Sequence, residues 1–311
     1  MNNSKQSVLV VGSVAIDWII TPHAEREESV GGSATFFSMA ASYFCPVRLV
    51  GVVGRDFPPT AVDDLKRAGV DTRGLEVVPD GLTFRWKGRY HENMNDRETL
   101  ETHLNCFEHF SPKLPPDFRA TESLFLANIQ PQLQLQVLEQ MVGPKVVGLD
   151  TMNLWIDIAH DELLAVLKKT DVLLINQEEA QQLSGKTHIA AAARAIRGMG
   201  PKWLVIKQGE YGALSFSPDG NVFGAPGMPL ENVADPTGAG DCFAGGFMGS
   251  LARSGDLSDD AVRNAVLWGS TMASFCVEGF SYDRLRGLSR EAIDARYRGF
   301  VNMMRVSPDA D

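Results

Sequence analysis

The sequence predicts an α/β protein built on a doubly wound, mostly parallel sheet with a small β lid. Short apolar runs alternate with helix-like segments through most of the chain, as buried parallel strands and their crossover helices do. Residues 82–106 break this rhythm by alternating aromatic with polar side chains, which is typical of half-exposed antiparallel strands. Together with residues 17–30 they are expected to form the lid, within a single domain that covers residues 1–311.

Six apolar runs have the length and composition of buried strands, and they lie at residues 8–12, 47–53, 124–127, 146–149, 172–175 and 203–207. A hairpin is expected next, with its turn at Pro218-Asp219-Gly220. Helices are expected at residues 34–44 and 60–68, from about 239 to 252, after the capping residue Ser258, and at 291–304. In such a sheet, ligands bind beyond the carboxyl ends of the strands.

The composition restricts the class of protein. The 311 residues carry 29 Lys and Arg against 39 Asp and Glu, which gives a formal net charge of −10. We expect no nucleic-acid partner, because a phosphate-binding surface needs an excess of cations. Four scattered cysteines form no metal-type pair and indicate reduced thiols. Because Met1 to Gln6 is polar and no apolar run could span a membrane, we expect a cytoplasmic protein without membrane contact.

The stretch 235–246, which reads Asp-Pro-Thr-Gly-Ala-Gly-Asp-Cys-Phe-Ala-Gly-Gly, opens an apolar helix. Pro236 suits the entry to a helix, and Gly238 and Gly240 let backbone N–H groups turn toward one point. Free N–H groups and the helix dipole make this an anion site, most naturally for phosphate. Asp241 adds a carboxylate, which suits a base beside a transferring phosphoryl group. For a shorter motif, a glycine-rich helix cap would be the alternative explanation.

This string resembles the C-terminal signature of the ribokinase/PfkB-type carbohydrate kinase family, Asp-Thr/Pro-Thr-Gly-Ala-Gly-Asp-x-Phe-x-Gly-Gly, and fills every position of it. The resemblance extends from Val8 to about Phe280 with the motifs in family order. It implies a ribokinase-like fold and a kinase that uses ATP and Mg²⁺ to phosphorylate a hydroxymethyl group of a small sugar or nucleoside. It also implies that Asp241 is the catalytic base and that the anion hole consists of Gly238, Ala239, Gly240 and Asp241.

The same resemblance implies a monovalent-cation site, for example for K⁺, beside the anion hole. Its ligands would be Asp235 and the carbonyl of Thr237, completed by residues 274–283. A cation there would shape the anion-hole loop electrostatically without touching the substrate.

Two motifs near the N-terminus concern the acceptor. Asp17 lies just past the first strand, and Gly31-Gly32 opens the first helix. By themselves these are a turn aspartate and a close backbone approach, whereas the resemblance implies that Asp17, Gly31 and Gly32 bind the substrate. Phe36 stands where the family usually carries an asparagine. It either presents an apolar wall to a substrate with a flat or apolar part, or packs the helix.

Two further motifs concern the donor. Asn176 to Glu179 matches the family's Asn-x-x-Glu, which implies that both residues position Mg²⁺ through water; otherwise it is an acidic helix N-terminus. The resemblance implies that ATP binds at Lys207, Gly209, Gly212, Asn264 and Gly279. Lys207, where many members have threonine, either adds positive charge to the triphosphate or covers the surface. The turn that begins at Asp150 lacks the arginine that often grips acidic sugars, which weakens the case for a keto-acid sugar.

The acceptor stays open between a sugar and a nucleoside. Aromatic side chains that could stack on a base are Trp18, Phe36, Phe84, Trp86 and Tyr90. A sugar phosphate, the third choice, would require that the lid cations point inward: Arg85, Lys87, Arg89 and Arg97. An alternative from another class is a catalytically inactive nucleotide-binding regulator.

Strand alternation predicts that Phe84, Trp86 and Tyr90 share one face of a lid strand, with Arg85, Lys87 and Arg89 on the other. Exposed sheet edges are seldom left bare, so we also expect a homodimer that pairs through the lids.

Overall fold

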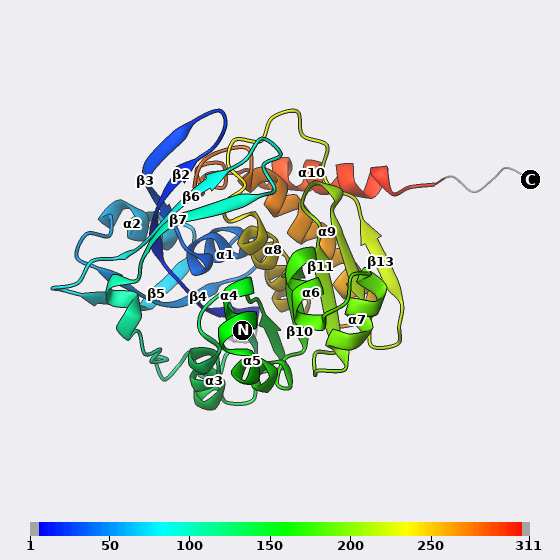
Figure 1. Cartoon of the computed structure of the whole chain (residues 1–311), viewed down its shortest axis with the longest axis horizontal. Helices are drawn as coiled ribbons and strands as arrows, with labels where there is room; N and C mark the ends of the chain where they lie inside the picture. Colours follow the sequence, from blue (N-terminus) through cyan, green and yellow to red (C-terminus); the bar gives the residue numbers. More distant parts are fainter. Residues whose placement is uncertain (1–5, 307–311) are drawn as a thin grey trace, which may run out of the picture.

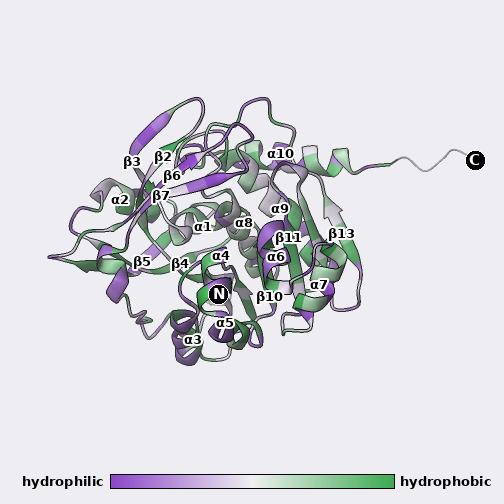
Figure 2. Cartoon of the chain, viewed as in Figure 1, coloured by the Kyte–Doolittle hydropathy of each residue, from purple (hydrophilic) through white to green (hydrophobic). Residues whose placement is uncertain are grey.

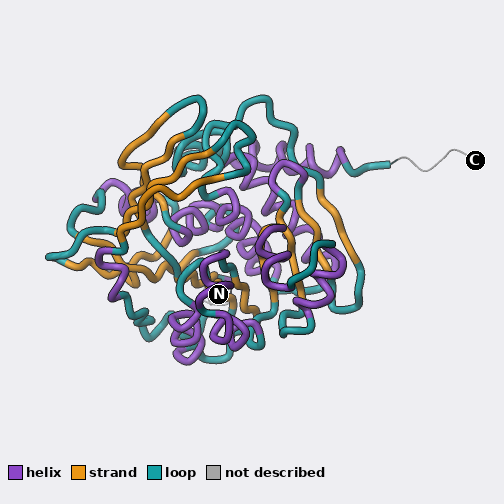
Figure 3. Tube along the Cα trace, in the orientation of Figure 1, coloured by secondary structure: helices purple, strands orange, loops and turns teal. Residues whose placement is uncertain are grey.

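The computed structural model describes residues 6–306, so the polar N-terminal stretch lies, except for Gln6, outside the described part. Its strands form one nine-stranded and one four-stranded sheet (Figure 1, Figure 3). The large sheet has the order β13-β12-β11-β10-β9-β8-β1-β4-β5. Its strands are β1 (Val8–Val11), β4 (Val47–Gly54), β5 (Val70–Val78), β8 (Ser123–Leu126), β9 (Val146–Leu149), β10 (Val172–Asn176), β11 (Trp203–Lys207), β12 (Ala213–Phe216) and β13 (Val222–Ala225).

The large sheet is doubly wound. β1 pairs in parallel with β4 on one side and with β8 on the other, so the chain leaves β1 in both directions. Only the hairpin β12–β13 runs antiparallel to its neighbours. This confirms the predicted fold class. The edge strand β5 was not predicted, because its charged residues Asp71, Arg73 and Glu76 conceal the apolar pattern of a strand.

Helices cover both faces of the large sheet. Alternate residues of β1 enter different cores: Val8 and Val10 pack with α1 and α8, and Leu9 and Val11 pack on the opposite side. β1 is therefore buried throughout, as its apolar sequence requires. Figure 2 shows this hydrophobic interior along the central strands. The helices are α1 (Ser33–Ala41), α2 (Pro59–Arg67), α3 (Pro131–Gln140), α4 (Asn153–Ile158), α5 (His160–Leu167), α6 (Gln177–Ser184), α7 (Ile189–Arg197), α8 (Ala239–Ser254), α9 (Asp259–Cys276) and α10 (Arg290–Met303).

The small sheet consists of strands from the two segments expected to form a lid. In the order β3-β2-β6-β7, it contains β2 (Ala15–Ile20), β3 (Glu25–Gly31), β6 (Phe84–Tyr90) and β7 (Arg97–His103). It lies at the upper left of Figure 1, where its strands extend past α1 toward α8. We call these four strands the lid. None of the helices within residues 6–306 is both long and apolar enough to cross a membrane.

Candidate active site

The predicted anion site lies at the N-terminus of α8. Gly238 caps this helix in the left-handed conformation, with φ of 77°. The ring of Phe36 packs against it so closely that a Cβ at residue 238 would lie 2.4 Å from ring atoms. Only glycine satisfies both conditions without strain. Phe36 is 2% exposed, so the expectation that it forms an apolar wall toward a substrate is wrong. Its ring instead packs against Gly238 in the anion-hole turn.

Four carboxylates at this end of the helix, those of Asp17, Asp150, Asp235 and Asp241, influence one another. Burial raises the pKa of Asp241 to about 7, and the negative charge of Asp150 contributes to the rise. Burial, together with the charges of Asp235 and Asp241, also raises the pKa of Asp17 well above its ordinary value. A carboxylate with a pKa near neutrality is suited to accept a proton in a reaction at neutral pH.

Asp17 is held in place by the glycine pair. A Cβ on Gly31 would lie 1.8 Å from Oδ2 of Asp17, and one on Gly32 would lie 2.5 Å from the carbonyl oxygen of Ser13. The pair therefore lets the Asp17 carboxylate and the turn after β1 pack against the start of α1. The structure thus brings Asp17, Gly31 and Gly32 together with the anion hole.

Lys207 is the cation of this site. Its Nζ lies 3.2 Å from Oδ2 of Asp150, and both side chains are largely buried. Burial opposes the charge of Lys207, but Asp150, Glu179 and Asp241 together raise its pKa. It therefore faces the anion hole rather than the surface: a Cβ on Gly240 would lie 3.1 Å from its Nζ. Asp150 was not predicted as a site residue, although its position after β9, beyond a strand's carboxyl end, was a usable signal.

Asn176 and Glu179 form a reciprocal cap at the start of α6. The side chain of Asn176 accepts the backbone N–H of Glu179, and that of Glu179 accepts the N–H of Asn176, each at 2.8 Å. Burial and the nearby Asp150 raise the pKa of Glu179 to about 7. Within residues 6–306, no cluster of three or more His, Cys, Asp or Glu side chains could enclose a metal. The carboxylates present fit Mg²⁺ held largely through water, which is how this ion usually binds.

A cavity of about 560 Å³ opens beside the anion hole. Lys207, Gly209 and Gly212 line it together with Ala239 and Gly240 of the anion hole. On its other side it is lined by α9, through Ser270, Ala273, Ser274 and Val277.

Two residues expected at the ATP site are not among those that line this cavity. Asn264 is exposed and accepts a hydrogen bond of 2.6 Å from the hydroxyl of Tyr297, well before the part of α9 that reaches the cavity. Gly279 packs against Arg284. Sequence order along α9 could not show which turn of the helix meets the cavity, so the assignment of Asn264 is corrected, whereas ATP binding at Gly279, which follows α9, stays a prediction.

The lid reaches the same cavity. The tip between β6 and β7 contributes Asn93, Met94 and Asn95 to its lining. Tyr90, at the end of β6, is 5% exposed, and its hydroxyl accepts a hydrogen bond of 3.1 Å from Oγ1 of Thr237. The lid in this structure is therefore closed against the anion-hole loop. No motif singled out the tip residues in the sequence.

The two faces of the lid agree with the predicted alternation. Tyr90 faces the site, whereas Lys87 lies 3.4 Å from the ring centre of Trp18 on the opposite face. Trp18 follows Asp17 directly on β2, so it points away from the site and is no stacking surface for an acceptor there.

The lid cations do not gather to bind a sugar phosphate. Arg85 pairs with Glu28 and Asp56, Lys87 with Glu101, and Arg89 with Glu98. These three cations are therefore neutralised by carboxylates, which removes most of the charge that a phosphorylated acceptor would need.

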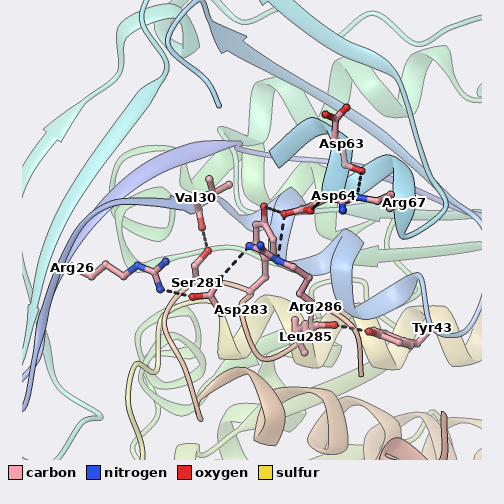
Figure 4. Close-up of polar contacts among 11 residues, drawn as sticks. Arg26, Val30, Tyr43, Asp63, Asp64, Arg67, Ser281, Asp283, Leu285 and Arg286 are labelled. Carbon is pink, nitrogen blue, oxygen red and sulfur yellow. Dashed lines mark hydrogen bonds and ion pairs between the residues drawn. The ribbon is translucent and has the colours of Figure 1, made fainter. Parts of the chain in front are cut away.

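The segment after α9 is tied to the lid. Ser281 donates a hydrogen bond of 2.5 Å to the carbonyl of Val30, and Arg26 of β3 pairs with Asp283 (Figure 4). Close by, Asp235 accepts the N–H of Thr237 at 2.8 Å through Oδ1, while its buried Oδ2 has no hydrogen-bond partner among residues 6–306. A buried carboxylate oxygen without a partner fits a site for a cation.

Comparisons with known proteins agree with this geometry. Residues 5–281 match the model of the pfkB family carbohydrate kinases. The chain belongs to this family. It is 30% identical over 257 residues to a cytidine kinase of Thermococcus kodakarensis, an alignment that covers 81% of this chain and 91% of the relative. The family and its relatives show that the chain is a carbohydrate or nucleoside kinase, as the resemblance implied.

Two solved structures show the same fold. The nucleoside kinase of Burkholderia thailandensis in complex with inosine has a TM-score of 0.77 at 21% identity, covering 94% of this chain and 97% of that one. An E. coli structure of the ribokinase type, solved with ATP and Mg²⁺, has a TM-score of 0.75 at 21% identity, covering 94% and 99%. These likenesses over nearly the whole chain confirm the predicted ribokinase-like architecture.

Proposed function

We propose that this pfkB-family kinase transfers the γ-phosphoryl group of ATP to the hydroxymethyl group of a nucleoside. The observation that carries the proposal is the position of Asp241, a buried carboxylate with a pKa near 7 at the N-terminus of α8. Its charge acts both on Lys207, which lines the cavity, and on Asp17 beside the glycine pair, which supports a reaction centre where a base, an anion hole and an acceptor-side carboxylate meet.

Each group has a defined part in this reaction. Asp241 accepts the proton of the attacking hydroxyl as its oxygen bonds to the γ-phosphorus and the bond to the β-phosphate oxygen breaks. The backbone of Gly238, Ala239 and Gly240 stabilises the charge on the transferring group. Lys207 lines the donor cavity and supplies positive charge to the phosphates.

The acceptor side favours a nucleoside over a free sugar. The named relatives support this choice, since one is a cytidine kinase and another is a nucleoside kinase of Methanocaldococcus jannaschii. Asp17 and the glycine pair would bind the sugar hydroxyls common to both acceptors, and the inward lid residue Trp86 offers a flat surface for a base. A free sugar is the second candidate, favoured by relatives such as deoxyribokinase of Salmonella typhi.

Two ions complete the proposal. Asn176 and Glu179 would hold Mg²⁺ through water, and this ion would neutralise phosphate charge when bound. Asp235 and the carbonyl of Thr237 would bind a monovalent cation, which the unpartnered Oδ2 of Asp235 supports. Asp235 itself does not line the donor cavity described above, so this cation would act on the loop.

A substrate panel tests the proposal. The purified chain is mixed with ATP, Mg²⁺ and, in turn, cytidine, inosine, other nucleosides, ribose, deoxyribose and fructose, and ADP release is followed. We expect the fastest release with a nucleoside and a nucleoside 5′-phosphate as product by mass spectrometry. Faster turnover of a free sugar would favour the second candidate. Binding of ATP without ADP release on any acceptor would instead support an inactive nucleotide-binding regulator.

A further inference from the structure

We propose that Arg97, at the start of lid strand β7, is a catalytic residue that binds the transferring phosphoryl group when the lid is closed. This inference rests on the proposed function and adds to it: the lid would serve the donor as well as the acceptor. In the sequence, Arg97 is distinguished only as one of four lid cations.

The sheet register determines where Arg97 points. In the ladder between β6 and β7, Arg97 lies directly opposite Tyr90. Side chains of directly paired residues project from the same face of a sheet. Tyr90 is buried and bonds Thr237, which directly precedes the Gly238 cap. The side chain of Arg97 therefore leaves the lid on the face that covers the anion hole.

The neighbours of Arg97 in sequence lie at the donor cavity. Asn95, two residues earlier, lines the cavity, and its Oδ1 would lie 2.6 Å from a Cβ on Gly209 of the nucleotide turn. Both neighbours of Arg97 therefore contact the site: Tyr90, opposite it in the ladder, contacts the anion-hole loop, and Asn95 contacts the nucleotide turn. The γ-phosphate of a nucleotide in the cavity would approach the anion hole between these two contacts.

The charge pattern of the lid sets Arg97 apart. Arg85, Lys87 and Arg89 each form ion pairs with carboxylates, whereas the charge of Arg97, opposite Tyr90 in the ladder, acts on the site carboxylates Asp150, Glu179 and Asp241. Its charge contributes to lowering the pKa of Asp241, against the larger effect of burial, so its field reaches the proposed base. In a site with this many carboxylates, a further protein cation besides Lys207 would help to receive a triphosphate, in addition to the proposed Mg²⁺.

The chemistry of the group suits this part. A guanidinium can donate two parallel hydrogen bonds to phosphate oxygens and stays protonated at all working pH values. During transfer the proton of the acceptor passes to Asp241, and Arg97 keeps its own protons while it stabilises charge on the equatorial oxygens. Because Arg97 comes from the lid, it would be in place only when the lid is closed. This would reduce the loss of the phosphoryl group to water.

Kinetics of Arg97→Gln and Arg97→Lys test the proposal, with Arg89→Gln as the control from the opposite face of the lid. We expect Arg97→Gln to lower kcat by about 10²–10⁴-fold while the acceptor KM changes by less than about 3-fold, because a contact made mainly in the transition state is lost. Arg97→Lys should recover part of kcat. Added guanidinium ion should stimulate Arg97→Ala, which a merely structural role of Arg97 would not allow. Arg89→Gln should resemble the unchanged enzyme.

Calorimetry separates this inference from the proposed function. Arg97→Gln should weaken binding of a non-hydrolysable ATP analogue but leave ADP binding unchanged, since only the analogue has a γ-phosphate. If Arg97→Gln keeps both kcat and the preference for the analogue, the inference is overturned while the kinase assignment stands. If the unchanged enzyme turns over no acceptor, the proposed function fails, and the analogue-to-ADP comparison still decides whether Arg97 contacts the γ-phosphate.

Discussion

At the residue scale, Asp241 combines a stability cost with a chemical use. Burial and the charge of Asp150 raise its pKa to about 7, so the folded protein resists ionising the group that the proposed reaction needs as a base. Lys207 and Arg97 act in the opposite direction. A bound triphosphate would attract both cations and so weaken their effect on the pKa of Asp241. The protonation of Asp241 therefore depends on whether the donor is bound.

Replacing Asp241 by Asn is expected to lower kcat by about 10²–10⁴-fold with little change in ATP affinity, because a general base is lost without loss of volume. In the unchanged enzyme, kcat/KM should fall as the pH drops below about 7, the pKa given by burial and Asp150. Steady-state kinetics between pH 5 and 9 measure both effects. Near-normal turnover of Asp241→Asn would show that another group accepts the proton.

The same substitution should stabilise the fold at alkaline pH. A carboxyl group whose pKa is raised on folding costs stability once it ionises, so the cost grows as the pH rises from about 4 to about 7. At pH 8, Asp241→Asn should therefore increase the free energy of unfolding by about 1–4 kcal/mol, and at pH 4 by much less. Urea unfolding at the two pH values measures this difference, and an equal effect at both would contradict the assigned pKa.

At the scale of elements, the loop before α8 depends on packing from several directions. Gly238 has a left-handed φ of 77°, and the Phe36 ring occupies the space that a side chain at residue 238 would need. On the lid side, Thr237 donates a hydrogen bond to the hydroxyl of Tyr90. Ser281 and Asp283 join the neighbouring segment to β3 of the lid (Figure 4). The loop, the segment after α9 and the lid therefore form one connected unit.

A monovalent cation at Asp235 should raise activity through this unit. We expect kcat to be several-fold higher in K⁺ than in tetramethylammonium at equal ionic strength, because a small cation neutralises the unpartnered Oδ2 of Asp235. Asp235→Asn should remove the difference between the two salts. Equal rates of the unchanged enzyme in both salts would rule out the site.

At the scale of the whole molecule, the lid is both a cover for the site and an exposed sheet. Its edge strands β3 and β7 carry mostly exposed charged residues, a feature that protects sheet edges from random pairing. The predicted homodimer through the lids remains a prediction. In a dimer that pairs through the outer faces, the paired Arg and Glu side chains of one lid would have to meet complementary charges on the lid of the second copy.

Trp86 and Trp18 allow the two uses of the lid to be separated. Trp86 pairs with Asp17 in the ladder and shares its inward face, whereas Trp18 lies beneath Lys87 on the other face. Trp86→Ala is expected to raise the acceptor KM by about 10-fold or to dissociate the dimer, and to leave ATP binding unchanged, since a stacking surface is worth about 1 kcal/mol or more. Trp18→Ala should leave the acceptor KM unchanged.

Acceptor kinetics and sedimentation of both tryptophan variants measure these effects. If Trp86→Ala behaves like the unchanged protein in both experiments, the inward face of the lid neither contacts the acceptor nor holds a dimer together. An effect of Trp18→Ala on sedimentation alone would place the interface on the outer face.

The sequence by itself determined the features that depend on local pattern. Continuous apolar runs predict buried strands, and the string from Asp235 to Gly246 predicts a helix N-terminus with a carboxylate in an anion site. Alternation along β6 likewise predicts which lid residues share a face. These features follow from the period of a strand and from the free N–H groups of a helix, which neighbouring residues alone dictate.

Only the tertiary structure decided which distant residues meet. It paired Lys207 with Asp150, brought Asn95 to Gly209, placed Arg97 opposite Tyr90, and left Asn264 outside the lining of the cavity. It also buried Phe36 beneath Gly238, where the sequence allowed either a wall or a packing residue. These contacts depend on strand order, register and the turn of a helix that faces a cavity, which are set by the packing of segments far apart in the chain.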